Sequence, residues 1–74
     1  MMNERIKQVR LSAKLSQTEF AEKILVSRSA VCKMESGENS PSEQTVKLIC
    51  QEFNVNGDWL RTGNGEMFVE LSKD

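Results

Sequence analysis

Five polar side chains between residues 28 and 36 are spaced so that they share one face of a helix. They follow one another at i, i+1, i+4, i+5 and i+8, and they are Arg28, Ser29, Cys32, Lys33 and Ser36. Val31 and Met34 fall on the opposite side, where they would face a core. Arg28 can form two parallel hydrogen bonds with a guanine edge, and Ser29 can bond to a base edge. The pattern favours a nucleic-acid contact over the alternative of a merely solvated helix face.

The rest of the sequence offers little that could support catalysis. It contains no histidine, which is the commonest general base and the commonest metal ligand. No Ser-x-x-Lys motif, glycine-rich phosphate loop or cluster of cysteines is present. We therefore expect a protein that is not an enzyme and that needs no metal and no cofactor.

The two cysteines, Cys32 and Cys50, are too few for the disulfide framework of a small secreted domain. We expect both to be reduced thiols. On the polar helix face, Cys32 can contact a thymine methyl group as a small apolar side chain. Redox sensing by Cys32 is a weaker alternative, because Arg28 and Lys33 are the only features that would lower its pKa.

The charges of the chain are distributed unevenly. A net charge of −1 argues against a general polyanion binder. Residues 1–37, however, carry seven basic and four acidic groups, whereas residues 38–74 carry three basic and seven acidic groups. The first half is therefore suited to phosphate, and the second half would repel it. No apolar run is long enough to span a membrane and no secretory pattern opens the chain, so we expect a cytoplasmic protein.

Helical signals fill the first half of the sequence. Good helix formers predict a first helix over residues 3–13. Ser16 and Glu19 form a capping box for a second helix, and Leu15 and Phe20 are placed as its hydrophobic staple. That helix must end near Leu25, because Ser27 offers the next cap. A third helix from Ser27 to Gly37 is expected to bury Ala30, Val31 and Met34.

Two further helices are expected in the second half. Residues 40–43 open the fourth helix, with Pro41 tolerated in its first turn. The apolar stripe that should face the core comprises Val46, Ile49, Cys50 and Phe53. Asn54 is expected to end this helix, and a short fifth helix runs from a cap at Asn56 to Gly63. Residues 64–74 should be extended or loosely ordered, which predicts one all-α domain over residues 1–68 and a tail over residues 69–74.

Several short motifs occur in a characteristic order. They are Gln17–Ile24, Val26–Val31, Met34–Gly37, Pro41-Ser42 and Asp58-Trp59-Leu60. With this set the chain resembles the phage-repressor and Cro type of helix-turn-helix domain, the xenobiotic-response-element family of regulators, over about residues 4–68. The resemblance implies a compact five-helix fold of the lambda-repressor kind. Its second and third helices form the helix-turn-helix, and the third helix reads the major groove.

The resemblance also implies roles for individual residues. It places Ser27, Arg28, Ser29, Cys32 and Lys33 at base-reading positions. It gives Gln17 a contact with the DNA backbone, as it does the loop after the third helix, which here supplies Ser36, Asn39 and Ser40. Glu38 in that loop would oppose phosphate. Arg10 and Glu35 are expected to pair and brace the third helix, the alternative being two unrelated surface charges.

The sequence departs from the family pattern at Leu25, where relatives often have glycine. A leucine there either adopts the left-handed conformation, at a cost on the order of 1 kcal/mol, or reshapes the turn. Leu48, Trp59, Met67 and Phe68 form either an exposed apolar patch suited to dimerisation or scattered surface residues.

The favoured function is sequence-specific binding of double-stranded DNA by a homodimeric prokaryotic or phage transcriptional regulator. A repressor is favoured over an activator, because repression needs only occupancy of the promoter. The alternative is an antitoxin-like or other protein-interaction module, in which the acidic second half meets a basic protein.

Overall fold

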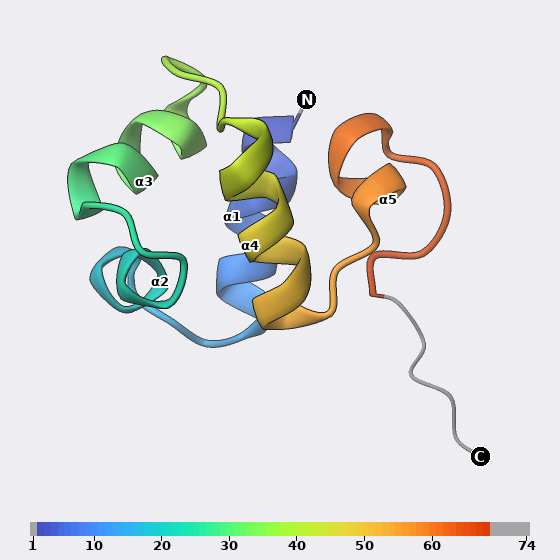
Figure 1. The fold of residues 1–74 in the computed structure, drawn as a ribbon, viewed down its shortest axis with the longest axis horizontal. Helices are drawn as coiled ribbons and strands as arrows, with labels where there is room; N and C mark the ends of the chain where they lie inside the picture. The colour runs from blue at the N-terminus through green and yellow to red at the C-terminus, as the bar shows by residue number, and fades with distance from the viewer. Residues whose placement is uncertain (1, 69–74) are drawn as a thin grey trace.

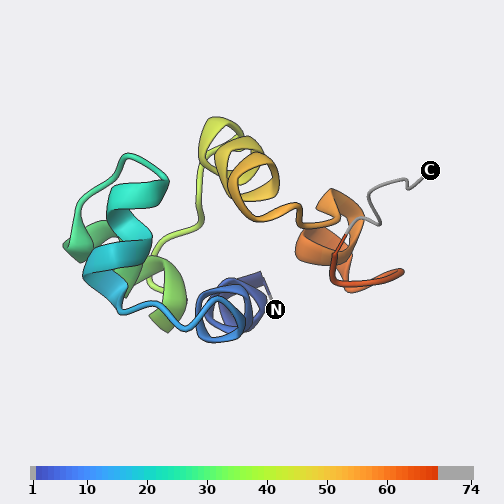
Figure 2. The same cartoon turned by 90° about the horizontal axis from the view of Figure 1, so that it is seen from below.

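The computed structural model describes residues 2–68, which form five helices. They are α1 (Met2–Ser12), α2 (Gln17–Lys23), α3 (Arg28–Ser36), α4 (Glu43–Phe53) and α5 (Gly57–Thr62). In Figures 1 and 2, α2 and α3 lie at one end of the molecule and α5 at the other, with α1 and α4 between them. The expected all-α five-helix architecture is thus confirmed.

Side-chain caps begin α2, α3 and α5 where the sequence predicts them, whereas the start of α4 differs from the prediction. The Ser16 hydroxyl accepts from the Glu19 amide at 3.1 Å, and the Glu19 carboxylate accepts from the Ser16 amide at 2.9 Å, which completes the capping box. Ser27 caps α3 with its hydroxyl alone, which accepts from the Ala30 amide, so the helix itself begins at Arg28. The exception is α4, whose cap is Ser42. Pro41 therefore precedes the cap, and the prediction that it lies in the first helical turn was wrong.

Left-handed residues end the last three helices. Gly37 (φ 87°) follows α3, Asn54 (φ 57°) follows α4 and Gly63 (φ 87°) follows α5. Asparagine tolerates this region because its short polar side chain bonds locally, and glycine has no Cβ to clash. All three terminators match the sequence predictions.

The core lies where the helices converge. Ile6 and Val9 of α1 and Phe20 of α2 are fully buried, as are residues from each of the other helices and the α4–α5 link: Val31, Ile49, Val55 and Leu60. Phe20 stacks on Phe53 with ring centroids 5.2 Å apart, which joins α2 to α4. Ala30 is half-buried, so the expectation that it lies in the core was wrong. Burial of apolar surface on this scale is the main force that holds a domain of this size together.

The segment after α5 returns along the α4–α5 link. The Asn56 amide donates to the Met67 carbonyl at 2.9 Å, and Val55 forms an isolated antiparallel bridge with Phe68. Leu48, Trp59 and Met67 are half-buried and pack against the core. Of the four residues that could have formed an apolar patch, only Phe68 is exposed, at 43%. The predicted tail over residues 69–74 lies outside the described residues. Within residues 2–68, no helix is both long enough and apolar enough to cross a membrane.

Candidate nucleic-acid interface

The link between α2 and α3 is a short turn with a strained residue. Leu25 has φ 62°, so the left-handed conformation is kept and the turn is not reshaped. The Leu25 amide donates to the Glu22 carbonyl at 3.4 Å, and the Val26 amide donates to the Ala21 carbonyl at 3.0 Å. The Leu25 side chain is 79% exposed, so burial does not offset the steric cost. The turn sets α3 against α2, which is its main packing partner.

The outer face of α3 carries the side chains that the sequence assigns to base contacts. Val31 and Met34 are buried. The polar residues on the opposite side are all exposed: Arg28, Ser29, Cys32, Lys33 and Ser36. Arg28 and Lys33 make this face cationic. The Ser27 side chain is also exposed, although its hydroxyl already accepts the Ala30 amide at 3.1 Å.

The acidic residue of α3 points away from this cationic face. Glu35 Oε2 accepts from Arg10 Nε at 2.7 Å, and Glu35 Oε1 accepts from Arg10 Nη2 at 3.2 Å. The Arg10 side chain is only 12% exposed and the Glu35 side chain only 5%. Arg10 Nη1 also donates to the Leu15 carbonyl at 2.9 Å, which ties the pair to the start of α2. A two-pronged, largely buried pair of this kind fixes orientation as well as distance.

Gln17 joins the same network. Its Nε2 donates to Glu35 Oε1 at 3.1 Å, and its side chain is half-buried at the first position of α2. No local signal in the sequence links these two residues, because they lie 18 positions apart. Gln17, which was expected to contact phosphate, is therefore hydrogen-bonded to Glu35, which was expected to brace α3.

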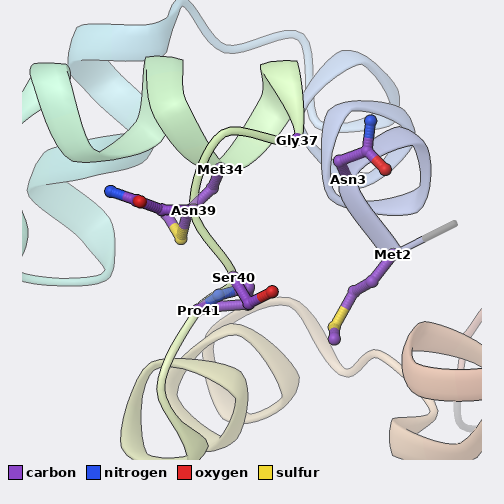
Figure 3. Close-up of a pocket in the computed structure, with 7 residues that line it drawn as sticks. All are labelled: Met2, Asn3, Met34, Gly37, Asn39, Ser40 and Pro41. Atoms are coloured by element: carbon purple, nitrogen blue, oxygen red, sulfur yellow. The ribbon is translucent and has the colours of Figure 1, made fainter.

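The loop after α3 borders a cavity of about 270 Å³, drawn in Figure 3. Asn39 and Ser40 of the loop line it together with Asn3 of α1, and the Asn39 side chain extends away from α1. The side-chain Nδ2 of Asn3 donates to the backbone carbonyl of Glu35 at 3.3 Å, which satisfies one of the last carbonyls of α3. Sequence reasoning missed Asn3, because only the tertiary fold brings the start of α1 to the end of α3.

The Ser36 hydroxyl is occupied within the loop. It donates to the Lys33 carbonyl at 3.1 Å and accepts from the Glu38 amide at 3.4 Å. Among the four residues assigned to phosphate contacts, Asn39 and Ser40 are exposed on the loop, whereas Gln17 and Ser36 already make internal hydrogen bonds.

The two thiols have different surroundings. Both cysteines are free, as the sequence predicts, and Cys32 is exposed on the α3 face. Cys50 is half-buried, and burial raises the pKa of its thiol, while nearby Arg61 lowers it and Glu43 raises it. Burial therefore disfavours the thiolate form of Cys50.

The α2–turn–α3 geometry and the exposed polar face of α3 define a helix-turn-helix domain. A helix-turn-helix family model matches residues 6–60, and the chain belongs to this family.

Solved structures agree with this assignment. The P22 c2 repressor in complex with a synthetic operator superposes with a TM-score of 0.80 at 25% identity, covering 86% of this chain and 97% of that one. The solution structure of the DNA-binding domain of the same repressor gives a TM-score of 0.78 at 25% identity, covering 86% and 84%.

The names of two relatives indicate different functions. The HTH-type transcriptional activator BcrR of Enterococcus faecalis is 39% identical over 61 residues, which are 82% of this chain and 30% of that protein. Antitoxin PezA of Streptococcus pneumoniae serotype 4 is 38% identical over 55 residues, which are 74% of this chain and 35% of that protein. The chain spans about a third of the length of these relatives. It is thus a helix-turn-helix domain similar to those of transcriptional regulators and repressors.

Proposed function

We propose that this chain binds double-stranded DNA sequence-specifically, as the DNA-binding domain of a prokaryotic or phage transcriptional regulator. The observation that carries the proposal is the exposed cationic face of α3, presented by a helix-turn-helix. The likeness to a repressor solved on its operator supports it. The role is one of binding without catalysis, and a regulator of this kind acts in the cytoplasm, where the DNA is.

Each exposed side chain of the interface has a role in this proposal. Arg28 forks onto a guanine, and Ser29 bonds to a neighbouring base edge. Lys33 reaches a base or a phosphate one helical turn further on, and Cys32 touches a thymine methyl group. Ser27 approaches the bases at the start of α3. The backbone contacts come from Gln17, Ser36, Asn39 and Ser40.

The regulator works as a homodimer in this proposal. Two copies of α3 read half-sites about 34 Å apart, one turn of the DNA helix. Repression is favoured, because a protein that only occupies a promoter already blocks it. Activation is the alternative, because one relative is named as a transcriptional activator. In vitro transcription from a promoter that carries the preferred DNA site distinguishes repression from activation.

A second candidate is an antitoxin-like protein-interaction module. It is favoured by the relative named as an antitoxin and by the acidic second half of the chain, with seven acidic and three basic groups in residues 38–74. In that case a basic protein would contact α4 and α5 instead of α3. The position of the contact on the chain therefore distinguishes the two functions.

The test is selection of a preferred duplex from a random pool, followed by affinity measurements on single-base variants of that duplex. Arg28→Ala is expected to lose about 1–3 kcal/mol on the preferred site and to relax base choice at one position. Lys47→Ala is the matched control, because Lys47 is an exposed cation on α4, away from α3. An equal loss on every duplex would show that Arg28 only touches phosphate. Failure to enrich any sequence would contradict the proposed function.

A further inference from the structure

Three helices meet at one buried carboxylate. Glu35 of α3 accepts hydrogen bonds from Arg10 of α1 and from Gln17 of α2, at 2.7–3.2 Å. The Glu35 side chain is only 5% exposed. No buried side-chain nitrogen or oxygen within residues 2–68 lacks a hydrogen-bond partner, so every buried polar atom of this network is satisfied. A satisfied buried network of this kind holds its members in one geometry.

The contact with Glu35 fixes the direction of the Gln17 amide. One N–H of Nε2 is directed at the carboxylate, which leaves the second N–H and the carbonyl oxygen for a ligand. A free glutamine side chain would lose rotamer freedom on binding, whereas a held one has already lost it. Arg10 neutralises the Glu35 charge, which would otherwise oppose a phosphate at Gln17.

We propose that Glu35 is a positioning residue for DNA: it aims the Gln17 amide at a phosphate, so that the backbone contact of α2 and the base contacts of α3 form as one rigid unit. The inference rests on the proposed function, since it concerns how the same interface is organised. Glu35 itself touches no DNA. Its effect passes through Gln17.

Replacing single phosphates makes the inference testable. Duplexes of the selected sequence are made with one phosphate at a time converted to an uncharged methylphosphonate. The phosphate bound by Gln17 is the one whose conversion weakens the wild-type protein but not Gln17→Ala. Loss of a hydrogen bond to a charged group predicts a weakening of about tenfold at that position.

The decisive variant is Arg10→Met together with Glu35→Met. Both partners are replaced, because removing one alone leaves a buried unpaired charge that could unfold the domain. This variant is expected to lose its sensitivity to the Gln17 phosphate, and adding Gln17→Ala should then change affinity by less than about twofold. Arg10→Lys is the matched control, since it keeps the carboxylate and an ion pair, and it should retain the sensitivity.

A measurement on the wild-type protein keeps the inference testable if the double variant does not fold. The side-chain amide of Gln17 should be more rigid by NMR relaxation than those of Gln44 and Gln51, which are exposed on α4. Equal mobility of the three amides would overturn the positioning role. Full phosphate sensitivity in a folded double variant would also overturn it, while leaving the DNA-binding function intact. A wild-type protein that binds no duplex would overturn both.

Discussion

Leu25 adopts a strained, left-handed backbone conformation in the short turn between α2 and α3. Its left-handed conformation costs about 1–2 kcal/mol, and its exposed side chain gains little from packing. Leu25→Gly removes that cost but adds the conformational entropy of glycine to the unfolded chain, about 0.4–1 kcal/mol. We therefore expect Leu25→Gly to raise the free energy of unfolding by roughly 0.5–1 kcal/mol, measured by urea denaturation.

The control for this prediction is Leu11→Gly. Leu11 is also exposed, at 55%, but it lies within α1, where glycine destabilises. A Leu25→Gly protein that unfolds at lower urea than the wild type would mean that the leucine side chain is stabilising despite its exposure. The base preference should not change, because glycine keeps the same turn.

The residues of the interface differ in how far the sequence could reveal them. The helical spacing of Arg28, Ser29 and Lys33 is local, so their common exposed face could be predicted. Contacts to Glu35 from Gln17 and Asn3 span 18 and 32 residues. Only the packing of three helices brings these side chains together, so no local pattern could show that Gln17 is held from within.

The rotation of α3 about its own axis determines which of its side chains can contact DNA. Val31 anchors this rotation, because it is fully buried. Val31→Ala should lower the free energy of unfolding by about 0.5–3 kcal/mol, through lost apolar burial and a residual cavity. Cys32→Ala, one residue further and exposed, should change it by less than about 0.5 kcal/mol. A thermal melt in which both variants match the wild type would mean that α3 is rotated from this arrangement.

The starts and ends of the helices could mostly be predicted, because caps are local. Ser16 with Glu19, and Gly37 after Ser36, each specify a boundary within a few residues. The start of α4 was predicted too early, because Pro41 is well suited to a first helical turn. The structure uses Ser42, whose hydroxyl accepts the Thr45 amide at 3.2 Å. Ala30 is half-buried at the edge of the core. Helical periodicity alone does not distinguish a residue at the edge of the core from one at its centre.

At the scale of the whole molecule, the charge is positive in the first half of the sequence and negative in the second. In Figure 1, α3 lies at the opposite end of the molecule from α5, the helix that carries Asp58. The residues proposed to contact the DNA backbone are all uncharged: Gln17, Ser36, Asn39 and Ser40. We therefore expect a shallow salt dependence, with a slope of log affinity against log salt weaker than about −4 per domain.

Two charge-reversal variants test, by the same salt titration, whether the position of a charge controls the salt dependence of DNA binding. Glu38→Lys in the loop after α3 should steepen the slope by about 1, since it adds one phosphate contact. Glu66→Lys makes the same change of net charge beyond α5 and should alter the slope much less. Equal steepening by both variants would show that net charge, and not the position of the contact, controls binding.

The most direct test of DNA reading by α3 is an amide-resolved NMR titration of the wild-type chain with the selected duplex, at low and then physiological salt. The proposed function predicts shifts centred on Gln17 and on residues 27–33, and smaller shifts as salt is added. Shifts confined to residues 43–62, or none at low salt, would contradict DNA reading by α3 and would direct the search to a protein partner at α4 and α5.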